Sequence, residues 1–128
     1  MFEVNRIAIL VAVVAAFVFS AIYYSLLSKQ LQAARGKGAK APAMTFSTVL
    51  IEVVRTFITA LFMAYALVNV RGPVEAAVMV FWLWLAFPVV LLTGSVIHEG
   101  TSVKLAIIHA FDWLVKLSIF GAIFVLWR

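Results

Sequence analysis

Cysteine is absent from the 128-residue sequence, and charged residues make up only 12% of it. The lack of cysteine excludes disulfide bonds, thiolate nucleophiles and thiolate metal sites. An ordinary soluble domain has about 25% charged residues, so the scarcity of charge argues against that class. What is present is apolar, since 66% of the residues are hydrophobic and the mean hydropathy is +1.17.

Continuous apolar stretches recur along the chain, each longer than the about 18 residues that a membrane-crossing helix needs. The later connections are short, which forces neighbouring helices to be antiparallel. The sequence therefore predicts an all-α integral membrane protein whose four transmembrane helices form an up-down-up-down antiparallel bundle. We expect one transmembrane domain, residues 1–128, with spans at 7–28, 45–70, 74–97 and 102–127 and a basic linker at 29–44.

Several residues mark where the predicted helices begin, bend and end. Thr45 is a suitable N-cap for the second span, and Thr101 or Ser102 for the fourth. Gly100 is a typical helix stop. Pro88 lies inside the third span, where proline removes a backbone hydrogen bond and kinks the helix.

Basic residues are unequally divided between the two ends of the predicted bundle. The linker end has Lys29, Arg35, Lys37, Lys40 and Lys104, and the other end has Arg6, Arg71 and Arg128. The positive-inside rule then predicts a multi-pass protein of the cell membrane, with the linker in the cytoplasm and both termini outside. The basic linker also suits anionic lipid headgroups, although topology is the plainer explanation, and no nucleic-acid partner is expected.

The fourth span carries ionisable residues in an otherwise apolar helix, "LAIIHAFDWLVKLSIF". His109, Asp112 and Lys116 fall within an arc of roughly 60° on one helix face. An Asp or a Lys at the centre of a span costs about 2.5 to 3.5 kcal/mol, so these charges need partners. Asp112 and Lys116 have the acid-first i, i+4 spacing that favours an ion pair.

The second span carries Glu52 and Arg55, and in the predicted topology it runs parallel to the fourth. Counted from the helix starts, Glu52 lies at the depth of His109, and Arg55 at the depth of Asp112. This register predicts an interhelical salt bridge between Arg55 and Asp112. The predicted intramembrane ionic network is Glu52, Arg55, His109, Asp112 and Lys116. Two hydroxyls on the same face as Glu52 and Arg55 would complete it, those of Thr48 and Thr59.

Such a network has three interpretations. It can select which helices pack together or lock a homo-oligomer, or it can form a proton relay or a substrate site. A metal site is the weakest of the three, because the candidate ligands Glu52, His98, His109 and Asp112 match no ligand motif. No nucleophile elbow, phosphate-binding loop or dinucleotide fingerprint is present, so we expect no enzyme, no metal and no cofactor.

The chain resembles the domain-of-unknown-function 1761 family of small bacterial membrane proteins over nearly its whole length. The similar segments are "AIYYSLLSKQ", "ALFMAYAL", "WLAFPVVLLTGSVIHEG" and "LAIIHAFDWLVKLSIFGAI". The resemblance implies four transmembrane helices, a bacterial inner-membrane location and no established activity.

The leading hypothesis is a non-enzymatic membrane protein that assembles with itself or with a larger membrane complex, held by the buried ionic network. The alternative is a small proton-coupled transporter or channel-like protein. In that case Glu52, His109 and Asp112 would titrate, and Arg55 and Lys116 would be their counter-charges.

Overall fold

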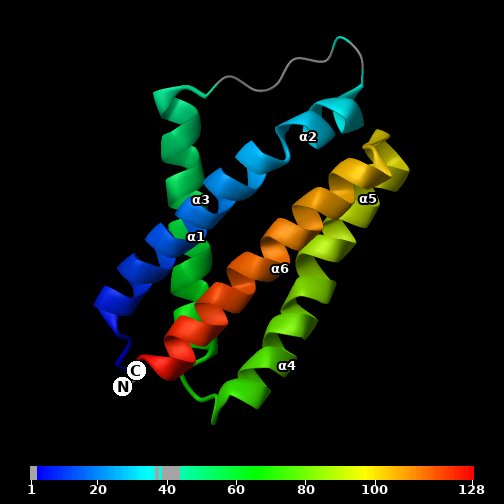
Figure 1. Cartoon of the computed structure of the whole chain (residues 1–128). Coiled ribbons are helices and arrows are strands. Elements are labelled where there is room, and N and C mark those ends of the chain that lie inside the picture. Colours follow the sequence, from blue (N-terminus) through cyan, green and yellow to red (C-terminus); the bar gives the residue numbers. More distant parts are fainter. Residues whose placement is uncertain (1–2, 37, 39–43) are drawn as a thin grey trace.

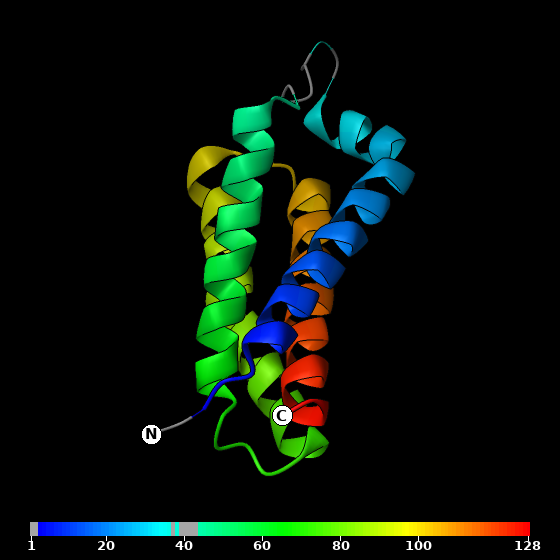
Figure 2. The ribbon, with the colours of Figure 1, turned by 90° about the vertical axis from the view of Figure 1, so that its left-hand side faces the viewer.

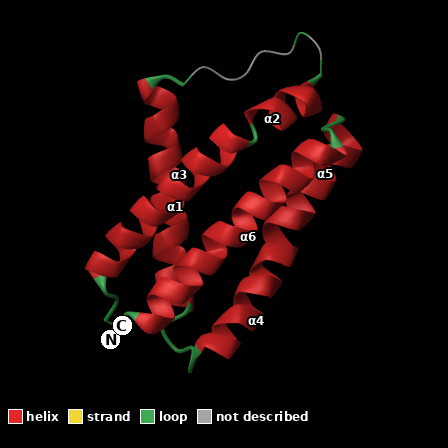
Figure 3. Ribbon diagram, viewed as in Figure 1, coloured by secondary structure: helices red, strands yellow, loops and turns green. Residues whose placement is uncertain are grey.

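The structure, a computed structural model, describes residues 3–36, 38 and 44–128. Within these residues the regular secondary structure is helical (Figure 3). The elements are α1 (Arg6–Leu26), α2 (Ser28–Arg35), α3 (Phe46–Ala66), α4 (Pro73–Trp84), the π-helical turn η1 (Leu85–Val89), α5 (Val90–Glu99) and α6 (Val103–Leu126). The all-α prediction is confirmed for this part of the chain.

Among the described residues, four helices are long and apolar enough to cross a membrane: α1, α3, the continuous helix Pro73–Glu99 formed by α4, η1 and α5, and α6. The start of α1 and the end of α6 lie at one end of the molecule, and the end of α2 and the start of α3 lie at the other (Figure 1). This second end is called the linker end below.

Side-chain caps begin three of these helices. The side-chain oxygens of Asn5, Thr45 and Ser102 accept hydrogen bonds from the backbone N–H three residues later. The predicted cap at Thr45 is therefore confirmed, and at α6 the cap is Ser102. Gly100 ends α5 with a φ of +71°, a left-handed conformation that glycine adopts without steric cost.

The predicted linker at 29–44 contains a helix that the sequence analysis did not anticipate. Helix α2 occupies Ser28–Arg35 and packs against α1 and α6, and its residue Leu31 is buried. A single large apolar residue in a short basic helix gives too little periodicity for the helix to be recognised from sequence. Of the linker cations, Lys29 and Arg35 are exposed or half-exposed on α2, whereas Lys37 and Lys40 lie outside the described residues.

Pro88 lies in the π-helical turn η1 rather than in regular α-helix. Because proline has no backbone N–H, the local hydrogen-bond ladder must adjust. Next to this turn, the indole Nε1 of Trp84 donates a 2.7 Å hydrogen bond to the backbone oxygen of Ala110. The Trp84 side chain therefore links the end of α4, next to the π-helical turn, to α6 by a hydrogen bond.

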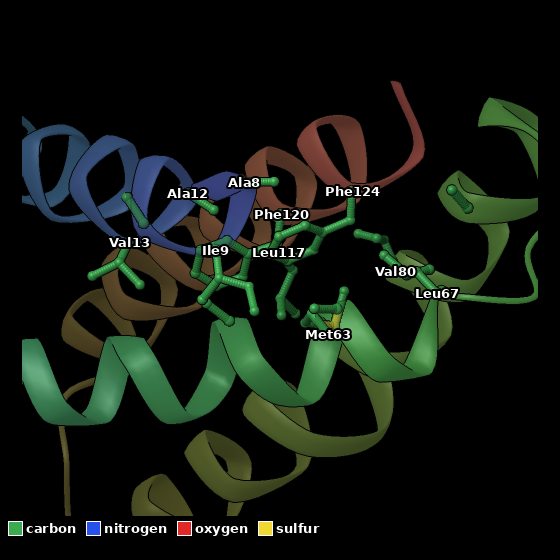
Figure 4. Close-up of a cluster of buried hydrophobic side chains, with 14 of the residues drawn as sticks. Ala8, Ile9, Ala12, Val13, Met63, Leu67, Val80, Leu117, Phe120 and Phe124 are labelled. Carbon is green, nitrogen blue, oxygen red and sulfur yellow. The ribbon is translucent and has the colours of Figure 1, made fainter. Parts of the chain in front are cut away.

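Helix α6 is the centre of the fold, since it packs against every other element. The buried apolar cluster shown in Figure 4 lies mainly where α1, α3, α4 and α6 meet. On α1, the fully buried alanines Ala8, Ala12 and Ala16 permit close helix packing, and Phe120 of α6 is buried in the same cluster. At Gly121 an added Cβ would lie 2.9 Å from Cγ2 of Val80, so α4 and α6 approach especially closely there.

The helices α1 and α3 pack against each other but are tilted, so they separate toward the linker end (Figure 2). Helix α3 contacts α1 and α6, and within the described part of the chain it makes no comparable contact with α4 or α5. The half of α3 nearest the linker end is therefore the least covered part of that helix, and Glu52 and Arg55 lie there.

Candidate functional site

The carboxylate of Asp112 is the centre of a buried polar network. Asp112 is 1% exposed and lies nine residues after the start of α6, about 14 Å along the helix axis. Its Oδ2 lies 2.8 Å from Nζ of Lys116 and accepts a 3.2 Å hydrogen bond from the hydroxyl of Tyr24. Its Oδ1 accepts a 2.7 Å hydrogen bond from the hydroxyl of Ser20. A buried carboxylate is thus paired with one cation and two neutral donors.

Tyr24 extends this network to His109. Its hydroxyl lies 2.7 Å from Nδ1 of His109, and the two rings are 5.6 Å apart. One residue earlier, the hydroxyl of Tyr23 donates a 2.8 Å hydrogen bond to the backbone oxygen of Ile108. Consecutive tyrosines of α1 therefore bind consecutive residues of α6, and they fix the contact between these two helices.

Lys116 has a second contact besides Asp112. Its Nζ lies 4.6 Å from the ring centroid of Trp113, within the distance at which a cation is attracted to an aromatic face. The side chain of Lys116 is only 10% exposed. Within the described residues, no buried side-chain nitrogen or oxygen lacks a hydrogen-bond partner, so every buried polar group of this network is paired.

A second ion pair lies on α3 and joins Glu52 to Arg55. In contrast to the Asp112 network, it is open: the side chain of Arg55 is 56% exposed and that of Glu52 is 43% exposed. The hydroxyl of Thr59 donates to the backbone oxygen of Arg55, and the hydroxyl of Thr48 lies 2.9 Å from that of Thr45. The two predicted supporting hydroxyls therefore make contacts within α3.

The predicted salt bridge between Arg55 and Asp112 is wrong. Both residues lie nine positions after the start of their helices, but equal depth does not bring them together. Helix α1 supplies hydroxyl donors to the Asp112 carboxylate, and the nearest cation is on the same helix. The predicted i, i+4 pair of Asp112 and Lys116 is confirmed. Glu52 pairs with Arg55, and no hydrogen bond or ion pair joins it to His109.

The contribution of α1 is not among the predicted features of the site. Ser20, Tyr23 and Tyr24 supply it, and none of them is a predicted site residue. Ser20 and Tyr24 have the i, i+4 spacing that places two side chains on one helix face. That spacing of two hydroxyls in an apolar helix was the available signal, but serine and tyrosine are common enough in membrane helices to make it weak.

No group of three His, Cys, Asp or Glu side chains within the described residues is arranged to hold a metal ion. The candidate ligand His98 is exposed near the end of α5, on a different helix from His109 and Asp112.

The fold thus defines an all-helical protein with four membrane-length helices and a buried polar centre between the first and the last of them. The chain belongs to the family described as protein of unknown function (DUF1761), which it matches over residues 7–125. The expected family membership is confirmed. No curated protein and no solved structure matches the chain.

Proposed function

We propose that the protein is an integral membrane component that crosses the bilayer four times in an up-down-up-down bundle. Four helices of sufficient length and apolarity among the described residues support this proposal, as does the position of the start of α1 and the end of α6 at one end (Figure 1). By sequence, the linker end has five basic residues and the other end has three, namely Arg6, Arg71 and Arg128, which favours a cytoplasmic position for the linker end.

We further propose that it acts without catalysis, by assembling with itself or with another membrane protein through α3. The ion pair of Glu52 and Arg55 is the observation that carries this proposal. Arg55 lies about 14 Å along α3 from its first residue, and more than half of its side chain is exposed. Exposed apolar residues surround the pair, among them Leu50, Ile51 and Ile58. Intramembrane charges are normally covered by protein or by water.

The buried network has a different role in this proposal. Asp112 and its partners hold α1 against α6 within one chain, so they are already covered. The exposed pair of Glu52 and Arg55 on α3 has no such cover. A neighbouring protein would cover it and remove the free-energy cost of exposing these charges to lipid. The ion pair of Asp112 and Lys116 is buried within the chain, whereas that of Glu52 and Arg55 is exposed. This difference is the reason for proposing assembly through α3.

Native mass spectrometry of the protein released from mild detergent tests the proposal. We expect a complex of defined stoichiometry, either of several copies or with a second protein. Replacing both Glu52 and Arg55 with glutamine should raise the dissociation constant roughly tenfold, equivalent to about 1.4 kcal/mol, because the charges that require cover are gone. Lys104→Gln, an exposed cation on α6, is the matched control and should leave the complex intact. A wild-type protein that stays monomeric in lipid nanodiscs would refute the proposal.

Proton-coupled transport is the second candidate, and the hydrogen-bonded chain from His109 through Tyr24 to Asp112 favours it. In a transporter, water rather than protein would cover Glu52 and Arg55.

Cysteine accessibility separates the two candidates, and the cysteine-free sequence gives no background. We expect Thr59→Cys, about 20 Å along α3, to be protected from a water-soluble maleimide in membrane vesicles, as assembly requires. Thr48→Cys should be protected as well. Ser28→Cys, at the linker end, is the control that should react with the maleimide. Ser118→Cys, on an exposed face of α6, is the lipid-facing control that should be protected. Labelling of Thr59→Cys at the rate of Ser28→Cys would favour transport.

A further inference from the structure

We propose that Tyr24 passes a proton between His109 and Asp112, so that the junction of α1 and α6 is a proton-accepting site. This inference goes beyond the proposed assembly, since it concerns α1 and α6 rather than the open face of α3. It depends on three groups that lie in one hydrogen-bonded line.

The geometry of the line is continuous. The Tyr24 hydroxyl is 2.7 Å from Nδ1 of His109 and 3.2 Å from Oδ2 of Asp112. A tyrosine hydroxyl has one hydrogen to donate and can accept at the same time. When it donates to Asp112, its oxygen accepts from Nδ1–H of His109; when it donates to His109, Asp112 loses that donor. The position of one hydrogen therefore couples the imidazole to the carboxylate.

The transfer balances without any further reactant. His109 with its hydrogen on Nδ1 takes up a proton at Nε2 and becomes an imidazolium. Nδ1 then passes its hydrogen to the Tyr24 oxygen, while the original Tyr24 hydrogen moves to Oδ2 of Asp112. His109 ends neutral with its hydrogen on Nε2, Tyr24 ends neutral, and Asp112 ends as a protonated carboxyl. One proton has moved inward, and the reverse sequence returns it.

Charged groups from three elements surround the line. Arg35 of α2, Arg55 of α3 and Lys116 of α6 act on His109, as does the Asp112 carboxylate. Positive charge on the imidazole is repelled by three cations, and a proton on Asp112 leaves Lys116 without its anion, so a fall in pH must drive the transfer. The other groups that act on Tyr24 are Tyr23 of α1 and Glu52 of α3.

The two hydroxyls bound to Asp112 provide a matched pair of variants. Ser20 donates to Oδ1 and Tyr24 to Oδ2, so Ser20→Ala and Tyr24→Phe each remove one hydroxyl from the carboxylate. Only Tyr24 also contacts His109. If the hydroxyls have only a structural role, the two variants should change the rate of Asp112 protonation to a similar extent. If Tyr24 is a relay, only Tyr24→Phe should slow it.

Time-resolved infrared spectroscopy after a drop in pH, on the full-length protein in lipid nanodiscs, measures the transfer. Wild type should develop the C=O band of a protonated carboxyl, and Asp112→Asn, which assigns the band, should lack it. Tyr24→Phe should slow its appearance roughly 100-fold, a typical contribution of a positioned proton-transfer group, whereas Ser20→Ala should leave the rate nearly unchanged.

His109→Gln interrupts the relay at its other end and replaces Tyr24→Phe as the test variant if Tyr24→Phe does not fold. It should slow the appearance of the carboxyl band to a similar extent. The relay is refuted if the wild type shows no band that depends on Asp112. It is equally refuted if the interrupted variants develop the band as fast as Ser20→Ala. Neither result would affect the assembly through α3, which native mass spectrometry measures separately.

Discussion

Replacing Lys116 with methionine should lower the free energy of unfolding by about 3 to 5 kcal/mol, the usual effect of leaving a buried charge without its partner. Methionine preserves much of the side-chain volume, so the loss would come from the charge. Asp112 would remain almost fully buried with only two neutral hydroxyls as donors. Equilibrium unfolding in mixed micelles, followed by tryptophan fluorescence, gives the difference directly.

The double variant Asp112→Asn with Lys116→Met should recover most of this loss, because no net charge is then left inside the protein. The amide oxygen of asparagine can still accept a hydrogen bond from Ser20 or Tyr24. Lys104→Met is the control, since it removes an exposed lysine from the same helix and should change stability by no more than about 0.5 kcal/mol. Equal losses for Lys116→Met and Lys104→Met would show that the buried ion pair does not stabilise the fold.

Adding a single methyl group at Gly121 should destabilise the packing of α4 on α6 by about 1 to 3 kcal/mol, the range found for overpacked cores. The new Cβ of Gly121→Ala would lie 2.9 Å from Cγ2 of Val80. Valine in a helix strongly prefers one χ1 rotamer, so Val80 cannot turn away freely. The same unfolding measurement in mixed micelles detects the change.

Gly94 gives the matched control for this substitution, since a Cβ there meets no atom within 4 Å. Gly94→Ala should be neutral or slightly stabilising, because alanine favours helix more than glycine does. Combining Gly121→Ala with Val80→Ala should restore part of the lost stability, because the second change removes the clashing methyl. Equal effects of the two glycine substitutions would contradict close packing at Gly121.

Local features of this fold could be predicted from the sequence because they depend on residues a few positions apart. The cap at Thr45, the helix stop at Gly100 and the ion pair of Asp112 with Lys116 are all of this kind. Each follows from the geometry of a single helix. The four long apolar helices could also be predicted, because the length of an apolar stretch depends only on the local composition of the sequence.

The neighbour that covers a polar face could not be predicted in the same way. Periodicity showed that His109, Asp112 and Lys116 share a face, but it does not say which helix lies opposite. The depth match of Arg55 and Asp112 suggested α3, whereas the structure places Ser20 and Tyr24 of α1 there. Charged residues stand out in an apolar sequence, whereas neutral hydroxyls do not, so the sequence pattern points to Arg55 rather than to Ser20 and Tyr24.

The central position of α6 has a consequence for how the chain is made. Synthesis proceeds from the N-terminus and early segments fold first, yet α6, the helix that contacts all the other described elements, is synthesised after them. Until it arrives, Ser20, Tyr23 and Tyr24 on α1 have none of the partners described above. The polar contacts that join α1 to α6 can therefore form only after α3, α4 and α5 have been synthesised.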